Sequence, residues 1–219
     1  LEFFLGKKIV RINSDRPFKH YLALYNGMLP DARTRWCTSM LKIKPFERYM
    51  GNDKVISYVG IRADEPYRTG YISTNGNVKA VYPFVENNIR RDDVIKILED
   101  SGLGLPSYYE WRSRSGCFFC FFQKRIEWVG LLERHPDLFK RAMEYEKTDP
   151  KSGSRFTWVE GESLEELSRP ERVAQIKEEN AKREASKKKS QSHLRLKDVF
   201  GNEPNSNPTS TCPCIGFNL

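Results

Sequence analysis

The alternation of apolar and polar residues divides the first half of the chain into short strands and helices. Residues 7–13, KKIVRIN, alternate and contain β-branched side chains, which predicts a short strand. Residues 16–29 predict a helix, and a second helix is expected to begin at a cap formed by Thr38. The run VISYVGIRA, residues 55–63, is apolar nearly throughout, so it predicts a strand buried on both faces, as in a parallel sheet.

The second half of the chain is dominated by helical patterns. An extended piece is expected at 78–87 and a helix at 91–102. Two consecutive helices are predicted at 124–135 and 136–147, followed by a short helical turn and a long polar helix within 163–190. Three large side chains of the two consecutive helices are assigned to the core: Trp128, Phe139 and Tyr145.

This order of elements predicts an α/β fold, with part of a parallel sheet flanked by helices and a helical C-terminal part. We expect an α/β domain over residues 1–168. Residues 169–219 are expected to form a basic helix and a flexible tail that contains cysteines.

Composition narrows the class of protein. Hydrophobic residues make up 38% of the chain, yet no apolar run approaches the roughly 20 residues needed to cross a bilayer. We therefore expect a soluble protein with no membrane partner. The N-terminus lacks the features of a secretory signal, and five cysteines are an odd number for a disulfide scaffold, so a cytoplasmic location is expected.

The net charge of +8 is concentrated near the C-terminus. Residues 169–197 contain 10 Lys and Arg against 4 Asp and Glu. A basic stretch of this kind can contact nucleic acid through phosphates, although a solvated helix end has the same composition.

A first candidate site is the segment RTRWCT with the two lysines that follow it. Arg35 and Lys42, with Arg33 and Lys44, lie near the predicted start of a helix. Free N–H groups at a helix N-terminus and arginine side chains both bind phosphate or sulfate. The alternative is an ordinary solvated basic loop.

A second candidate is GIRADEPYR, residues 60–68, at the carboxyl end of the best strand, where open α/β sheets bind ligands. Arg62 and Arg68 could hold a phosphate, with Asp64 and Glu65 ordering them or contacting ribose. Alternatively, this is a charged loop in which the arginines pair with the neighbouring carboxylates.

The third candidate is SGCFFCFF, residues 115–122. Cys117 and Cys120 have the C-x-x-C spacing of two thiolates on one metal, although a redox dithiol and two buried apolar cysteines share that spacing. The three histidines have no ligand-like spacing, so an all-cysteine site is favoured, with Cys37 as third ligand and Cys212 or Cys214 as a possible fourth. Four phenylalanines would give a [4Fe–4S] cluster an apolar shell, and zinc is the alternative metal.

Taken together and in order, RWCTxxLK, GIRADExxR and SGCFFCFFQKxxEW resemble the phosphoadenosine phosphosulfate reductase family. LLERHPDLF and the late FTWxxGESLEEL also resemble its cysteine-rich bacterial members, and the similarity covers roughly residues 5–180. The resemblance implies an adenine nucleotide α-hydrolase-like fold and an enzyme that binds an adenylyl nucleotide, either ATP or phosphoadenosine phosphosulfate. It implies phosphate or sulfate binding by Arg35, Lys42, Arg62 and Arg68, and cluster ligation by Cys37, Cys117 and Cys120.

Two departures from the family pattern matter. The nucleotide loop SGGKDS is absent and its usual place lies upstream of residue 1, so the chain is expected to be N-terminally truncated. The family's terminal catalytic cysteine lies in an ECG-like motif, whereas this chain has TCPCIG. These features predict a sulfur-metabolism oxidoreductase or sulfurtransferase with a sulfur- or electron-donor protein as partner. The alternative from another class is a non-catalytic, zinc-stabilised nucleic-acid-binding module.

Overall fold

The computed structural model describes residues 1–70, 76–148, 153 and 155–199, with the side chains of the last helix described through residue 187. The described chain divides into two compact units, Leu1–Pro106 and the residues from Ser107 onward. The domain boundary predicted between residues 168 and 169 falls within the second unit, between α9 (Leu164–Leu167) and α10 (Pro170–Val199). The tail at 200–219 lies outside the described residues.

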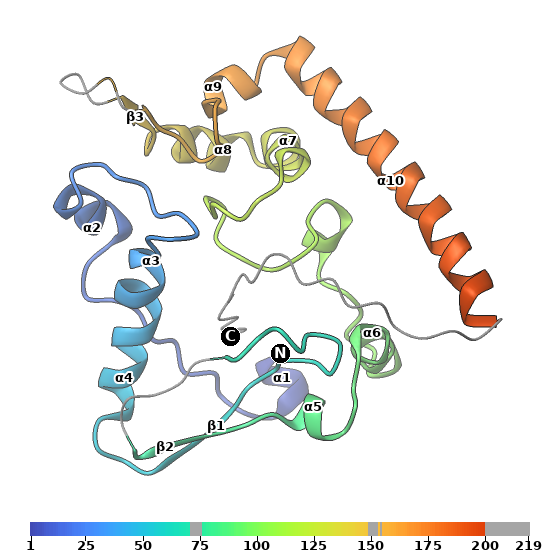
Figure 1. The fold of residues 1–219 in the computed structure, drawn as a ribbon. Helices are drawn as coiled ribbons and strands as arrows, with labels where there is room; N and C mark the ends of the chain where they lie inside the picture. Colours follow the sequence, from blue (N-terminus) through green and yellow to red (C-terminus); the bar gives the residue numbers. More distant parts are fainter. Residues whose placement is uncertain (71–75, 149–152, 154, 200–219) are drawn as a thin grey trace. The chain divides into compact units, whose positions relative to one another are not determined.

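The first unit is mixed α/β and contains a small parallel sheet flanked by helices. Strands β1 (Val55–Tyr58) and β2 (Val78–Val81) pair in parallel, with Val55 opposite Val78 (Figure 1). The prediction of parallel pairing is thereby confirmed for these two strands. The helices of this unit outside residues 36–50 are α1 (Glu2–Leu5), α2 (Phe18–Leu24), α5 (Pro83–Glu86) and α6 (Arg91–Asp100).

Two strand predictions in this unit are wrong. Residues 7–13 form no strand; they follow a left-handed turn at Gly6, and the N–H of Ile9 bonds to the Glu2 carboxylate at 2.7 Å instead of to a ladder partner. Strand β1 is also shorter than predicted and is not buried on both faces, because Ile56 and Tyr58 remain 58% and 74% exposed. Only one face of the two-stranded sheet is covered by the described unit.

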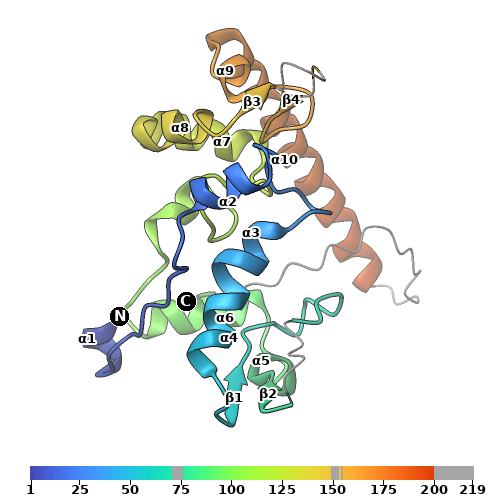
Figure 2. The ribbon, with the colours of Figure 1, turned by 90° about the vertical axis from the view of Figure 1, so that its left-hand side faces the viewer.

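Residues 36–50 form one helical stretch with an irregular centre. Segment α3 (Trp36–Thr38) leads through a π-helical turn, η1 (Ser39–Ile43), into α4 (Lys44–Met50) (Figure 2). Pro45 lacks an N–H, and a wider turn before it accommodates the missing intrahelical bond. The prediction that Thr38 caps this helix is wrong: Arg35 is the N-cap, and Thr38 is buried within the helix.

The described residues of the second unit form four α-helices, one 3₁₀ turn and a small hairpin. A 3₁₀ turn, η2 (Ser107–Glu110), is followed by α7 (Arg125–Arg134) and α8 (Pro136–Met143) (Figure 1). The residue ranges of α7 and α8 agree closely with the two helices predicted from the sequence. Strands β3 (Lys147–Thr148) and β4 (Arg155–Phe156) pair antiparallel before α9 and α10. None of the helices in the described part of the chain combines the length and apolar composition that a membrane crossing needs.

The core of the second unit lies where α7, α8, α9 and the start of α10 meet. Trp128, Leu164 and Leu167 are fully buried, and Ile176 of α10 is 2% exposed. The core assignments of Trp128, Phe139 and Tyr145 are confirmed. Trp111 packs so closely on α7 that a Cβ at Gly130 would lie 2.8 Å from its ring, so this helical position requires glycine.

Candidate metal centre

The two cysteines lie on a loop, residues 113–124, that is closed at its base by one buried carboxylate. Glu127 is 2% exposed, and its Oε1 accepts bonds from the Ser113 N–H at 2.7 Å and the Ser113 hydroxyl at 2.6 Å. Its Oε2 accepts a bond from the Lys124 N–H at 2.9 Å. Burial raises the pKa of Glu127, but the hydrogen bonds from Ser113 and Lys124 outweigh it, so this pKa is lowered overall. One ionised side chain thus joins the first and last residues of the loop.

The inside of the loop is held by a second buried side chain, Arg112. Its Nη1 donates to the carbonyl of Gly116 at 3.1 Å, and its Nη2 donates to the carbonyl of Cys117 at 3.2 Å. Arg112 is 8% exposed, and its guanidinium also lies 5.3 Å from the centre of the Trp111 ring. The backbone around the first cysteine is therefore fixed from within by a planar, bidentate donor.

The two thiols occupy successive turns of the loop. The Cys120 N–H donates to the Cys117 carbonyl at 3.2 Å, and the Gln123 N–H donates to the Cys120 carbonyl at 2.9 Å. Cys117 is exposed and Cys120 is half-buried. Burial raises the pKa of the Cys120 thiol, while the backbone N–H of Phe122 and the nearby arginines act in the opposite direction.

Phe118 and Phe119 attach the loop to the rest of the unit, and none of the four phenylalanines lies in a strand. Phe119 contacts Tyr145 and Trp158, with ring centroids 5.3 and 5.7 Å apart. Phe118 lies beneath the Arg141 guanidinium at 5.2 Å, and Phe121 and Phe122 contact each other at 4.2 Å. All four rings are half-buried, so they give the cysteines a partly apolar surrounding.

The residues of this loop fit half of a four-thiolate metal site. They supply two sulfur donors at C-x-x-C spacing, a fixed backbone, a cationic environment and aromatic neighbours. Within the described ranges no group of three or more His, Cys, Asp or Glu side chains gathers as a complete site. Cys37 is half-buried in α3 of the other unit, and Cys212 and Cys214 lie outside the described residues.

The first basic candidate site is less concentrated than predicted. Arg35 is the N-cap of α3 and is half-buried, as expected for a residue at a helix start. Lys42 lies in η1, about two turns further along, and is exposed. Trp36 between them is buried against Phe18 and Tyr25, each with its ring centroid 5.0 Å away. Arg35 therefore lies at the N-terminus of the helix, whereas Lys42 lies further along it.

The second basic site is organised by a buried carboxylate. Glu65 is 8% exposed and bonds to Arg68 at 2.9 Å; its other close cation is Arg62, at 3.6 Å. Arg62 also bonds to Asp64 at 2.9 Å, which raises the arginine's pKa and lowers that of the aspartate. The structure therefore brings Arg62 and Arg68 together after β1. Both arginines pair with neighbouring carboxylates, and this pairing is compatible with a phosphate site and with an ordinary charged loop.

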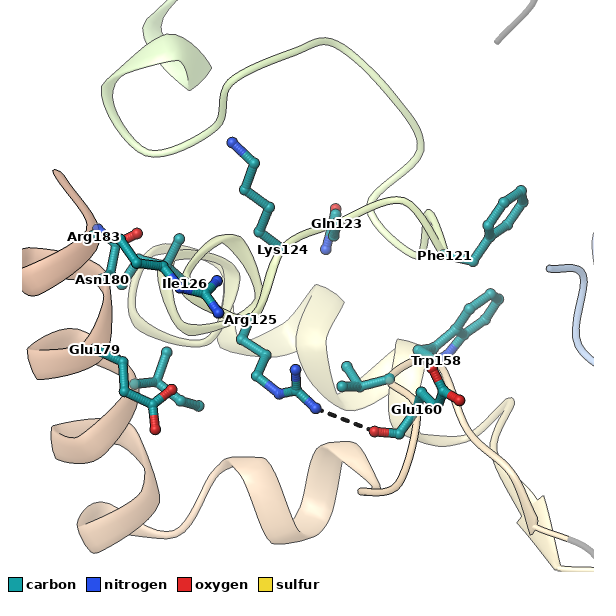
Figure 3. Close-up of a pocket in the computed structure, with 12 residues that line it drawn as sticks. Phe121, Gln123, Lys124, Arg125, Ile126, Trp158, Glu160, Glu179, Asn180 and Arg183 are labelled. Atoms are coloured by element: carbon teal, nitrogen blue, oxygen red, sulfur yellow. Dashed lines mark hydrogen bonds between the residues drawn. The ribbon is translucent and has the colours of Figure 1, made fainter. Parts of the chain in front are cut away.

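A cleft of about 290 Å³ adjoins the cysteine loop within the second unit (Figure 3). It lies between the N-terminus of α7, the segment around Trp158 and α10, and neither Cys117 nor Cys120 lines it. The Arg125 side chain donates to the Glu160 carbonyl at 3.1 Å, whereas the Lys124 side chain points away from Glu160 (Figure 3). Lys124, Arg125 and Arg183 share the lining with Glu160 and Glu179, so the cleft has no clear preference for an anion or a cation.

The sequence-based prediction missed the two residues that shape the loop. Glu127 stands three residues after Lys124 at a helix start, the spacing at which a carboxylate bonds back to the N-cap N–H. That signal was present in the sequence. Arg112 has no comparable signal, because its role depends on a side chain turning back into a loop that follows it.

Comparisons with models of known protein families, with curated proteins and with solved structures found no match. Function is therefore inferred from the residues themselves and from their geometry.

Proposed function

We propose that this protein is a sulfur-metabolism enzyme of the phosphoadenosine phosphosulfate reductase family that binds an adenylyl nucleotide and a [4Fe–4S] cluster. The observation that carries the proposal is the cysteine loop. A C-x-x-C pair is presented on a backbone that Glu127 and Arg112 fix from both sides. Such a support is typical of metal ligands, which need their geometry set in advance. The remaining ligands in this proposal are Cys37 and one of Cys212 and Cys214.

The nucleotide-binding part of the proposal rests on the first unit. Its parallel strand pair leads directly into the loop of Arg62 and Arg68, and ligands of open α/β sheets bind at the carboxyl ends of strands. In this proposal the fold is adenine nucleotide α-hydrolase-like. The arginines would hold phosphate or sulfate oxygens of ATP or phosphoadenosine phosphosulfate, with Arg35 and Lys42 adding positive charge. The bound cluster would bind or deliver the sulfur.

The cluster is tested by purifying the full chain without oxygen and measuring iron, sulfide, zinc and visible absorbance. We expect a brown protein whose iron–sulfur absorbance is lost in Cys117→Ser and in Cys120→Ser, because each removes a thiolate ligand. The same loss is expected for Cys37→Ser and for one of Cys212→Ser and Cys214→Ser. His20→Asn, at a histidine with no proposed role, is the control and should remain brown.

A colourless protein with stoichiometric zinc would contradict the cluster and favour the second candidate function, a zinc-stabilised nucleic-acid-binding module. The feature that favours this alternative is the exposed basic side of α10, including Lys182, Arg183 and Lys187. Two of these lysines pair with Glu178 and Glu184 of the same helix, which reduces the charge available for phosphates. The sulfur-metabolism enzyme is therefore preferred.

Nucleotide binding is the second test of the proposal. We expect ATP or phosphoadenosine phosphosulfate to bind with affinity that falls at least ~10-fold in Arg62→Ala and Arg68→Ala, because each loses a charge-assisted phosphate bond. Isothermal titration calorimetry of the full chain is the measurement, and Arg48→Ala is the control, since Arg48 pairs with Asp15 on an exposed surface. Binding that is unchanged in both variants would remove this loop from the site.

A further inference from the structure

Arg112 is a buried cation without a matching anion. Arg112 is 8% exposed, and it forms no ion pair with a carboxylate among the described residues. Its Nε atom is buried and has no hydrogen-bond partner in the same part of the chain. Because an uncompensated buried charge is costly, a structure of this kind calls for negative charge nearby.

Glu127 is the acidic side chain with the strongest electrostatic influence on Arg112, but the two form no ion pair. Glu127 favours the charged guanidinium electrostatically, but its oxygens are bonded to Ser113 and Lys124. The other charged neighbour is Arg114, a second cation, which lies over the Phe122 ring at 4.9 Å and donates to the Phe122 carbonyl. The loop is thus flanked by two guanidinium groups and lacks a carboxylate of its own.

The Cys120 thiol lies beside this cation. A Cβ built on Gly116 would be 3.3 Å from Arg112 Nη2 and 4.0 Å from Cys120 Sγ, so the guanidinium and the sulfur border the same small space. When thiols bind a metal they lose their protons, so Cys117 and Cys120 would each contribute a negatively charged thiolate.

We infer that Arg112 is the counter-charge of the metal-bound thiolates of Cys117 and Cys120. This inference rests on the proposed function and extends it to a residue that is not a ligand. Arg112 has two roles here: its two carbonyl bonds hold the Cys117 turn, and its charge lowers the cost of placing thiolates in a half-buried site. The planar guanidinium suits both roles, because it can donate to two carbonyls at once and remains charged.

The test separates charge from shape with two variants. Arg112→Gln keeps an N–H₂ group for one carbonyl but removes the charge, whereas Arg112→Lys keeps the charge and loses the fork. The probe is Co²⁺ added to the metal-free full chain, followed by thiolate-to-cobalt absorbance and, in parallel, thermal unfolding of the metal-free protein. Arg134→Gln is the matched control, because Arg134 pairs with Glu110 at the surface of the same unit and lies outside the cysteine loop.

We expect Co²⁺ affinity to fall ~10- to 100-fold in Arg112→Gln and less than ~5-fold in Arg112→Lys and Arg134→Gln. The metal-free Arg112→Gln protein should unfold at the wild-type temperature or above it, because a buried unpaired charge has been removed. A loss of metal affinity without a loss of metal-free stability is a result that a purely structural role cannot give.

Three outcomes would overturn the inference: unchanged affinity in Arg112→Gln, equal loss in Arg112→Lys, or a metal-free Arg112→Gln protein that is unfolded. The first two, with wild-type protein that binds Co²⁺ through its thiols, leave the proposed cluster intact and remove only the role of Arg112. A wild-type chain that binds neither Co²⁺ nor a reconstituted iron–sulfur cluster would remove both.

Discussion

Replacing Trp128 with alanine is expected to reduce the free energy of unfolding of the second unit by about 3–5 kcal/mol. The Trp128 side chain is 0% exposed and contacts the rings of Phe139 and Trp158, each with its centroid 6.3 Å away. Its removal leaves a cavity between α7, α8 and the segment around Trp158, and the neighbouring helices can close only part of it. Urea unfolding followed by circular dichroism measures the change.

Two further variants define what the loss means. Trp128 carries a buried Nε1–H that has no hydrogen-bond partner among the described residues, so Trp128→Phe loses ring volume but also removes an unsatisfied donor. We expect Trp128→Phe to cost less than half as much as the alanine variant. Phe3→Ala, at a fully exposed aromatic residue, should have little effect. A cost below ~1 kcal/mol for Trp128→Ala would show that this core does not stabilise the unit.

The second large effect is expected from Glu127→Gln, which should cost about 3 kcal/mol and loosen the cysteine loop. Both oxygens of Glu127 accept hydrogen bonds from donors. In Glu127→Gln one oxygen is replaced by an N–H₂ group, which would face a donor of Ser113 or the Lys124 N–H. Hydrogen exchange measured by mass spectrometry should show faster exchange across residues 113–124. Glu133→Gln is the matched control on α7, because Glu133 pairs with Lys177 at the surface.

The pH dependence of Glu127 has a defined direction. Its pKa in the folded protein is lowered from the ordinary value of 4.5, so its contribution to stability is fully present above that value and is lost as the pH falls toward the folded pKa. The difference in unfolding free energy between wild type and Glu127→Gln should therefore be largest near neutral pH and shrink below pH 4.5. A difference that grows in acid would contradict the assignment of an ionised Glu127.

If the cysteine loop depends on Glu127, then metal binding depends on it as well. Each end of the loop is fixed by this carboxylate, and the positions of Cys117 and Cys120 follow from that closure and from the bonds of Arg112. The two residues act differently. Loss of Glu127 should reduce stability and metal affinity together, whereas loss of the Arg112 charge should reduce metal affinity alone.

The sequence by itself determined the helices around the core of the second unit and the residue types that the candidate sites contain. The periodicity around Trp128 and Phe139 predicted two helices and their buried faces, because a repeat of 3.6 residues is a local property. The C-x-x-C spacing placed two thiols on one short segment, since a span of four residues has few conformations. The acidic and basic residues of 60–68 were likewise close enough in the chain to predict their pairing.

The tertiary structure decided what depends on contacts between distant residues. Whether residues 7–13 form a strand depends on a partner for their backbone, and none of the described residues supplies one, whereas residues 55–58 pair with 78–81. The length and exposure of β1 depend on what covers its second face. The closing of SGCFFCFF into a loop required Glu127 to bond to Ser113 fourteen residues away, and required Arg112 to turn inward. Such bonds join groups whose spacing in the sequence has no fixed pattern, so only the folded chain reveals them.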